Sequence, residues 1–172
     1  MTISRLGIVG SGIMGSGIAE VAAKAGVDVV LRSRQQATAD AMLAGLEKSL
    51  AKQVERGKLE ETAAKEIASR VTATSALSDL ADCDLVLESV VEDLDVKKAL
   101  FAELDGIVKP GAILATNTST LPVIEMAMAT GRPENVIGVH FFNPAPAMSL
   151  VEIIAPMTAS EDTVAAVTAF AT

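Results

Sequence analysis

The sequence predicts an α/β protein with a doubly wound, mostly parallel sheet. Short apolar runs rich in β-branched residues alternate with helical patterns along the whole chain, which is typical of parallel sheets with right-handed crossovers. A glycine-rich turn joins the first run to the first helical pattern. Of the 172 residues, 50% are hydrophobic and 21% are charged, so the chain can bury one core. We expect a single dinucleotide-binding domain over residues 1–172.

The first strand–turn–helix unit contains Gly-Ser-Gly-Ile-Met-Gly at positions 10–15, between an expected strand over 5–9 and an expected helix over 13–25. In a G-x-G-x-x-G turn, the first glycine permits a tight turn, the second lets the backbone approach a pyrophosphate, and the third lets the helix pack closely. The helix N-terminus adds free N–H groups and a positive dipole end. The unit predicts a Rossmann-type dinucleotide site; the alternative is a glycine-rich turn without a ligand. The residues expected at the cofactor are Gly10, Ser11, Gly12, Ile13, Met14 and Gly15.

The next elements are a strand and a long helical excursion. Residues 27–32 are apolar and β-branched, as in a buried parallel strand. Apolar residues then recur at helical spacing over 35–56, Gly57 breaks the pattern, and a second helix is expected over 60–70. This excursion is longer than a crossover needs, which indicates a role besides packing.

The second half continues the alternation. Strands are expected over 71–74, 84–89, 112–116, 136–140 and 150–154. Helices are expected over 93–104 and from Thr158 to Phe170. Between them, Thr120 is expected to cap a short helix that has Pro122 in its first turn, where the missing N–H is tolerated.

Composition excludes several classes of function. The net charge is 14 minus 22, or −8, whereas nucleic-acid binding needs a basic surface. No apolar run approaches the roughly 18 residues of a membrane span, and Cys83 is the only cysteine, so we expect no disulfide and no metal site. The first strand leaves no room for a signal peptide. We therefore expect a cytoplasmic protein without nucleic-acid or membrane partners.

Polar residues follow three of the expected strands. Glu88 and Ser89, Asn117 and Ser119, and His140 and Asn143 all stand where a strand ends. In doubly wound sheets, ligands bind beyond the carboxyl ends of the strands, so these residues predict a site at that edge.

The strongest chemical pair in the sequence is His140 with Glu152. His140 is the only histidine, and Glu152 lies in an otherwise apolar strand, where a carboxylate is costly unless it is paired. If the two strands are neighbours, Glu152 can orient His140, which would exchange a proton with a substrate hydroxyl. The alternative is a structural histidine beside an edge-strand glutamate.

Four runs of the sequence resemble the 3-hydroxyacyl-CoA dehydrogenase family, and most of all its bacterial 3-hydroxybutyryl-CoA dehydrogenases. They are residues 7–15, 117–121, 140–148 and 150–152, of which the Phe-Asn-Pro run after His140 is very specific. The resemblance implies an NAD(P)-dependent oxidoreductase that interconverts 3-hydroxyacyl-CoA and 3-oxoacyl-CoA by hydride transfer. It implies that His140 and Glu152 are the catalytic acid–base pair and that Ser119 binds the substrate oxygen. Further roles implied by the resemblance are cofactor contacts at Glu92, Lys97, Asn117 and Asn143 and coenzyme A contacts at Ser49 and Arg56.

The helical excursion carries a basic stripe that fits the last of these roles. Lys48, Lys52 and Arg56 recur every four residues and so share one helix face, which could meet the phosphates of coenzyme A. The alternative is a solvated face balanced by nearby glutamates.

The chain departs from the family at the end of its second strand. The fingerprint expects an acid there for the ribose 2′-hydroxyl of NAD, and the family would have aspartate at position 33, but the chain reads Arg32-Ser33-Arg34. Loss of the acid removes a repulsion against the 2′-phosphate of NADP, and an arginine can bind that phosphate. We therefore expect NADP to be favoured over NAD; the alternative is NAD held through backbone and hydroxyl contacts.

The second departure is the end of the sequence. The family continues into a C-terminal helical domain, which provides the dimer contact and closes over the acyl chain, whereas this sequence ends at Thr172 before that domain. The resemblance implies an acyl-CoA substrate and a homo-oligomer for the intact form. Two alternatives stay open: a dinucleotide-binding module without turnover, and another hydroxyacid dehydrogenase built on the same first half.

Overall fold

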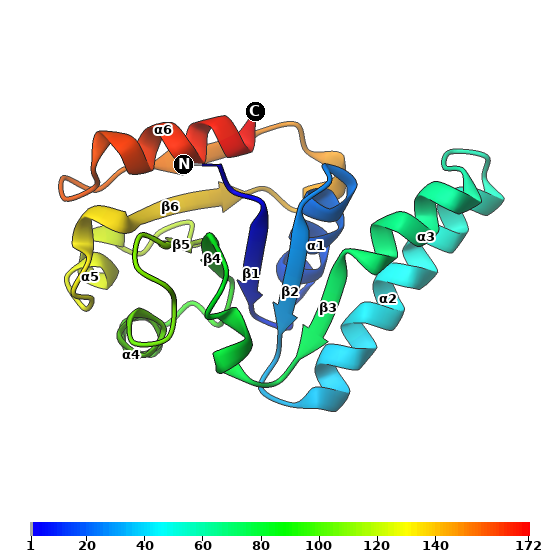
Figure 1. The fold of residues 1–172 in the computed structure, drawn as a ribbon. Coiled ribbons are helices and arrows are strands. Elements are labelled where there is room, and N and C mark those ends of the chain that lie inside the picture. Colours follow the sequence, from blue (N-terminus) through cyan, green and yellow to red (C-terminus); the bar gives the residue numbers. More distant parts are fainter. Residues whose placement is uncertain (1) are drawn as a thin grey trace.

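The computed structural model describes residues 2–172 and has one seven-stranded sheet in the order β3-β2-β1-β4-β5-β6-β7 (Figure 1). Its strands are β1 (Arg5–Val9), β2 (Asp28–Arg32), β3 (Val71–Thr74), β4 (Leu85–Glu88), β5 (Ile113–Thr116), β6 (Val136–Phe141) and β7 (Val151–Ile154). All neighbours pair in parallel except β6 and β7, which are antiparallel. The strand order reverses between β1 and β4, so the predicted doubly wound class is confirmed.

Helices cover both faces of the sheet. They are α1 (Ile13–Lys24), α2 (Gln36–Glu55), α3 (Glu61–Ser69), α4 (Leu94–Asp105), α5 (Val123–Ala127) and α6 (Glu161–Ala171). Alternate side chains of each strand point to opposite faces, and this produces two cores. On one face, Ile8 belongs to a core that receives Ile18 of α1, Leu46 of α2 and Val167 of α6. The other core receives side chains of α4 and α5, and it contains Val9.

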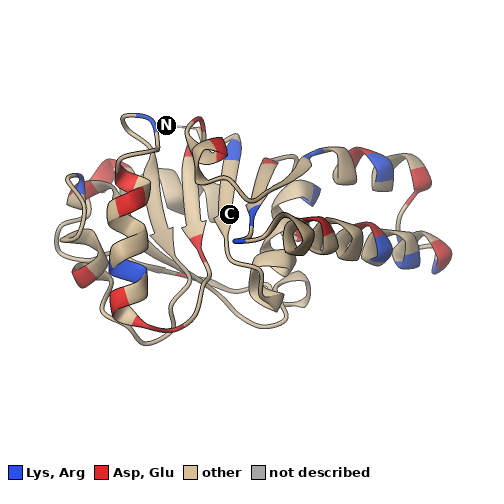
Figure 2. Cartoon of the chain, turned by 90° about the horizontal axis from the view of Figure 1, so that it is seen from below, with Lys and Arg blue, Asp and Glu red and all other residues tan. Residues whose placement is uncertain are grey.

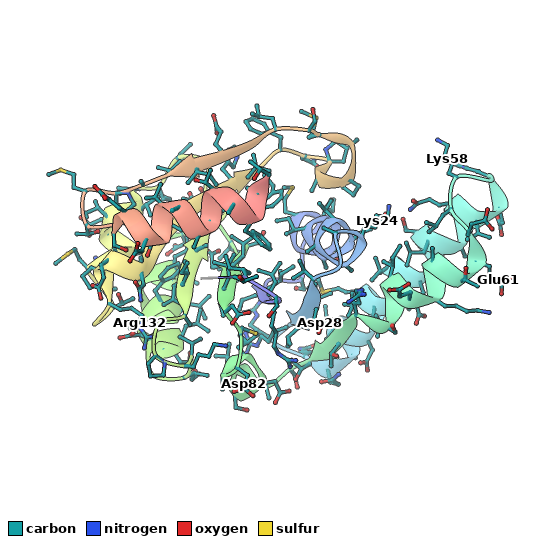
Figure 3. All side chains as sticks on the ribbon, turned by 45° about the horizontal axis from the view of Figure 1, so that its top comes forward. Lys24, Asp28, Lys58, Glu61, Asp82 and Arg132 are labelled. Atoms are coloured by element: carbon teal, nitrogen blue, oxygen red, sulfur yellow. The ribbon has the colours of Figure 1, made fainter. Side chains whose placement is uncertain are left out.

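Helices α2 and α3 form a hairpin that extends beyond the edge of the sheet next to β3 (Figure 1). Lys58 and Glu61 lie at its far end (Figure 3). Apolar residues such as Met42 and Leu50 anchor the hairpin on the core at its near side. The long helical excursion that the sequence predicts is therefore an arm with a solvated outer part. Within residues 2–172, no helix combines the length and the apolar character needed to cross a bilayer.

Two expected helix starts are wrong, and hydrogen bonds to nearby hydroxyls explain both. The short helix begins at Val123, not after Thr120, because the hydroxyl of Thr118 accepts the N–H groups of Thr120 and Leu121 and holds a turn there. The last helix begins at Glu161, because the hydroxyl of Ser160 accepts the N–H of Thr163 as an N-cap.

Strand β7 is antiparallel because residues 142–150 are too few for the crossover that a parallel strand requires. As the last strand of the sheet, β7 has one free edge, and the Glu152 side chain is 53% exposed. Glu152 therefore lies on an edge strand and is half exposed, and its strand is the neighbour of the strand that carries His140, as the expected pairing requires. Antiparallel pairing puts Glu152 directly opposite His140 of β6.

Candidate active site

The glycine turn between β1 and α1 has two glycines that packing requires and one that it does not. Gly10 has a φ of +142°, and a Cβ atom there would lie 2.2 Å from the carbonyl oxygen of Ser89. A Cβ atom on Gly15 would lie 2.5 Å from the carbonyl oxygen of Gly10. A Cβ atom on Gly12 would meet no heavy atom within 4 Å. Gly12 therefore faces open space at the N-terminus of α1, where a phosphate group would fit.

Two cavities meet at this turn, and both are lined by Gly12, Ser89 and Val90. The first, of about 790 Å³, also includes Gly10, Ser11, Arg32, Ser33 and Arg34. The second, of about 480 Å³, also includes Ile13, Met14, Glu92, Lys97, Asn117, Ser119, His140 and Asn143. The two cavities form a cleft over the carboxyl ends of the strands, with the helix N-terminus at its middle. This arrangement fits a ligand that has two halves joined by phosphates.

His140 and Glu152 form a cross-strand pair at the wall of the second cavity. Nδ1 of His140 lies 2.8 Å from Oε2 of Glu152, within hydrogen-bonding distance. The Phe142 ring packs against the imidazole, with a centroid distance of 4.7 Å. With Nδ1 donating to the carboxylate, Nε2 is the ring nitrogen left to act in the cavity that His140 lines. The pair can therefore orient an imidazole for proton transfer.

Asn117 and Ser119 follow β5 and face the same cavity. The side-chain oxygen of Asn117 accepts the N–H of Phe141 at 2.8 Å, and this bond joins the end of β5 to the end of β6. Since a side-chain amide has donors as well as an acceptor, the NH₂ group of Asn117 keeps its capacity to donate. The carboxyl ends of these two strands are thereby held together where Ser119 and Asn143 line the cavity.

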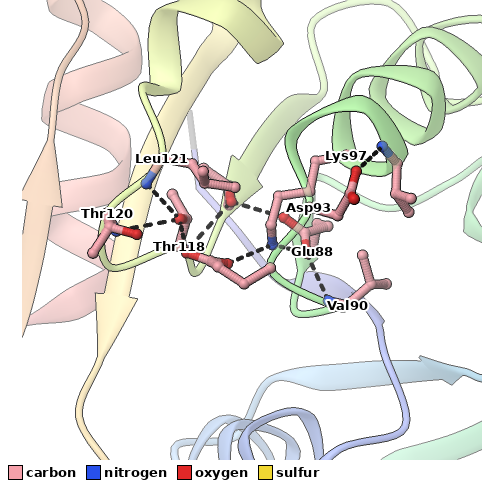
Figure 4. A network of polar contacts seen from close by, with 10 residues as sticks. Glu88, Val90, Asp93, Lys97, Thr118, Thr120 and Leu121 are labelled. Carbon is pink, nitrogen blue, oxygen red and sulfur yellow. Dashed lines mark hydrogen bonds and ion pairs between the residues drawn. The ribbon is translucent and has the colours of Figure 1, made fainter.

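Lys97 lies on the floor of this cavity in a network of polar side chains (Figure 4). Its ammonium group lies 2.6 Å from Oε1 of Glu88 and 3.2 Å from Oε2 of Glu92. The hydroxyl of Thr118 donates to Glu92. Partial burial raises the pKa of Glu92, but the hydrogen bond from Thr118 and the charge of Lys97 lower that pKa by more, so the group is held in its charged form.

The residues expected at coenzyme A lie along α2, outside both cavities. Ser49 lines a separate groove between α1 and α2, and its hydroxyl donates to the carboxylate of the buried Glu20 at 3.0 Å. Lys52 is exposed farther along the helix, and Arg56, the residue that caps its C-terminus, is exposed as well. The hairpin carries basic and acidic residues in turn along its outer part (Figure 2).

The sequence singles out His140 with its partner Glu152, and it singles out Asn117 and Lys97 without indicating the residues that hold these two. Glu88 is noted only as a polar residue at a strand end, Thr116 only as the last residue of an expected strand, and Thr118 and Phe142 only as members of the runs that carry the resemblance. A signal for Glu88 was present, since a carboxylate ends an otherwise apolar strand and a lysine follows in the next helix. Glu20 gives no signal, because its burial depends on packing between α1 and α2.

Comparisons with known proteins agree with this geometry. A family model described as "3-hydroxyacyl-CoA dehydrogenase, NAD binding domain" matches residues 5–172. The 3-hydroxybutyryl-CoA dehydrogenase of Clostridioides difficile is 48% identical over 159 residues, which are 92% of this chain and 57% of that protein. The 3-hydroxybutyryl-CoA dehydrogenase of Mycobacterium tuberculosis is 45% identical over 170 residues, which are 98% of this chain and 59% of that protein. The crystal structure of 3-hydroxybutyryl-CoA dehydrogenase from Escherichia coli matches with a TM-score of 0.97 at 36% identity, over 99% of this chain and 36% of that one.

The expected preference for NADP is wrong, because the matched family is that of an NAD binding domain. The structure gives a physical reason. Nε of Arg32 donates to the carbonyl oxygen of Ser75 at 3.2 Å, so Arg32 is engaged with the main chain. Ser33 is 4% exposed, and only Arg34 is left as an exposed cation at this end of the cleft. The absence of an acid at position 33 removes a repulsion against a 2′-phosphate but does not by itself build a phosphate site.

The chain spans less than two thirds of the length of these relatives. The family model nevertheless matches nearly the whole of this chain, from residue 5 to residue 172. The chain therefore belongs to the 3-hydroxyacyl-CoA dehydrogenase family, and residues 5–172 match its NAD binding domain.

Proposed function

We propose that this chain binds NAD and is the cofactor-binding part of a dehydrogenase that interconverts 3-hydroxyacyl-CoA and 3-oxoacyl-CoA. Its curated relatives are named for 3-hydroxybutyryl-CoA, which is the substrate we expect. The observation that carries the proposal is the in-register pair of His140 and Glu152, at the wall of a cavity that adjoins the glycine turn. A dehydrogenase for alcohols needs such a proton-transfer group beside the nicotinamide.

In this proposal NAD, when bound, supplies the nicotinamide that accepts the hydride or returns it. During oxidation His140 takes the proton of the 3-hydroxyl group as the C–H bond breaks, and during reduction it returns that proton to the carbonyl oxygen. Glu152 keeps the imidazole in one orientation and stabilises its protonated form. Ser119 donates a hydrogen bond to the same substrate oxygen.

The cleft supports a division of binding roles. The glycine turn and the N-terminus of α1 would hold the pyrophosphate, and residues 32–34 would contact the adenosine half. Glu92, Lys97, Asn117 and Asn143 would contact the nicotinamide half. The coenzyme A phosphates would meet the face of α2 that carries Ser49, Lys52 and Arg56.

The greater length of the relatives supports a two-part design for the complete protein. We propose that residues 1–172 are one dinucleotide-binding domain and that a helical domain completes the substrate cleft and the oligomer contact. On this view the chain by itself binds the cofactor but turns over slowly, because nothing closes over the acyl chain to position it and exclude water.

Two measurements test the proposal. NADH titration of this chain can be followed by NADH fluorescence without interference from protein emission, because the sequence has no Trp and no Tyr. NADH oxidation with acetoacetyl-CoA is then compared between this chain and a version extended to the length of its relatives. We expect saturable NADH binding by both and turnover by the extended version. Absence of NADH binding, or of acetoacetyl-CoA reduction by the folded extended version, would refute it.

A further inference from the structure

A buried ion pair lies beneath the cavity that contains His140. Glu88 is 0% exposed and Lys97 is 1% exposed, and their charged atoms are 2.6 Å apart. Two charges removed from water carry a large desolvation penalty, and a well-packed apolar pair stabilises a core at least as well. Stability alone therefore does not account for charged residues at these positions.

Glu88 accepts hydrogen bonds from three elements. Its Oε1 accepts from the N–H of Val90 at 2.6 Å and from Lys97, while its Oε2 accepts from the hydroxyl of Thr116 at 2.7 Å. Its main-chain oxygen accepts the N–H of Asn117 at 2.9 Å. One residue at the end of β4 thus ties together the following loop, the first turn of α4 and the end of β5 (Figure 4).

Each of these contacts leads to the wall of the cavity. Val90 lines both cavities at the glycine turn, and Lys97 lines the one that contains His140. The hydroxyl of Thr116 also accepts the N–H of Thr118, so the segment 116–119 depends on the same anchor. The ammonium of Lys97 has three N–H donors, and two of them face Glu88 and Glu92, which leaves one for a ligand.

We infer that Glu88 is a positioning residue for the nicotinamide end of the site. It holds the Lys97 ammonium in place as a charged donor, and it holds the segment that presents Asn117 and Ser119. Lys97 and the segment 116–119 line only the cavity that contains His140, whereas Val90 lines both cavities, so Glu88 acts mainly on the nicotinamide half of the cofactor. This inference rests on the proposed function, since it assumes that NAD occupies the cleft.

The experiment compares two ligands on this chain. NADH spans both cavities, whereas ADP fills only the adenosine and pyrophosphate part. We expect Glu88→Gln to raise the Kd for NADH by about tenfold, the low end for loss of a charge-assisted contact. The Kd for ADP should change by less than about twofold, an effect below about 0.4 kcal/mol. A purely structural role would weaken both ligands alike or neither.

A second variant guards against misfolding of the first. Thr116→Val keeps the side-chain shape but removes the hydrogen bond to Glu88 and the one that the hydroxyl accepts from the N–H of Thr118. We expect it to raise the Kd for NADH by about threefold with ADP unchanged. Asp105→Asn is the control, because it removes the charge of another close ion pair, with Arg132, which is partly exposed and lines neither cavity. We expect Asp105→Asn to lower the melting temperature without altering the ratio of the two dissociation constants.

The outcomes separate the inference from the proposed function. If the unmodified chain binds neither ADP nor NADH, the proposed function fails. If it binds both, and folded Glu88→Gln or Thr116→Val retains the original ratio, the inference about Glu88 is overturned. An equal loss of both ligands in these variants also overturns it, because the effect would then be a general one.

Discussion

At the scale of single residues, the chemistry of this protein depends on what each polar group is bonded to. His140 lies near the end of β6, after four buried residues. It is a candidate catalyst because Glu152 contacts one of its ring nitrogens and Phe142 packs on its ring. Glu152 is half exposed, and the role that we propose for it is to orient the imidazole. An imidazole held in this way can exchange a proton from its other nitrogen.

The histidine pair gives the first prediction, made for a version extended to the length of the relatives. We expect His140→Gln to lower kcat by about 10²-fold or more, the usual contribution of a general acid or base. We expect Glu152→Gln to lower kcat by about tenfold and to alter its pH profile, since the imidazole loses its charged partner. Both are measured as acetoacetyl-CoA reduction, with the Kd for NADH as a check on the cofactor site. Glu161→Gln, an exposed exchange at the start of α6, is the control. Near-full kcat in His140→Gln would rule out the assignment.

At the scale of elements, the α2–α3 hairpin combines an anchored base with a solvated outer part. Its base is fixed by apolar packing and by Glu20, which accepts hydrogen bonds from Lys24, Ser49 and Gln53. Burial raises the pKa of Glu20, but these three partners lower it by more, so the carboxylate stays charged and keeps Ser49 in place. These contacts fix the part of α2 from which the basic stripe of Lys48, Lys52 and Arg56 extends.

This element gives the second prediction. In the extended version, we expect Arg56→Glu to raise the KM for acetoacetyl-CoA by about tenfold, because an arginine–phosphate contact is replaced by a repulsion. The KM for an acetoacetyl thioester without the nucleotide part should not change. Lys65→Glu, a charge reversal on α3 of a lysine that pairs with Glu61, is the matched control. If both variants change both KM values equally, Arg56 does not contact the coenzyme A phosphates.

At the scale of the whole molecule, Asp84 joins the N-terminal strand to the centre of the sheet. Its carboxylate accepts the N–H groups of Ser4 and Arg5, at 2.8 and 2.9 Å, and the ammonium of Lys109 at 2.7 Å. Partial burial raises the pKa of Asp84, but the hydrogen bond from Lys109 and those from Ser4 and Arg5 lower it by more, so the pKa lies well below its usual range. The folded state therefore stabilises the charged form of the Asp84 carboxyl group.

The third prediction follows from the sign of that shift. A carboxylate with a lowered pKa stabilises the fold above its ordinary pKa of 3.8, and this contribution is lost as the pH falls below that value. We expect Asp84→Asn to reduce the free energy of unfolding by about 1–2 kcal/mol at neutral pH, for loss of charge-assisted hydrogen bonds at a partly exposed site. The difference from the unmodified chain should shrink at about pH 3. Urea unfolding at both pH values measures it, with Asp82→Asn as the exposed control. A difference that is constant with pH would contradict this account.

Local patterns in the sequence were enough to predict the sheet class and the glycine turn, and to single out His140 as a candidate for proton transfer. Strand and helix periods depend on residues a few positions apart, and the turn between β1 and α1 depends on glycines that sit within six consecutive positions. The polar residues after β4, β5 and β6 could be assigned to one edge because parallel strands end at the same side. The resemblance to the family could also be found from the sequence, because it depends on short runs of consecutive residues.

Only the tertiary structure decided how those residues are held. The bond from Glu152 to His140 requires an antiparallel β7 in one register, and the burial of Glu88 with Lys97 requires α4 to pack over the ends of two strands. The expected preference for NADP was wrong because it also depended on tertiary contacts. The missing acid at position 33 does not tell which group the side chain of Arg32 binds. Burial, strand register and side-chain pairing all depend on contacts between residues far apart in the chain. A local sequence pattern carries no information on those contacts.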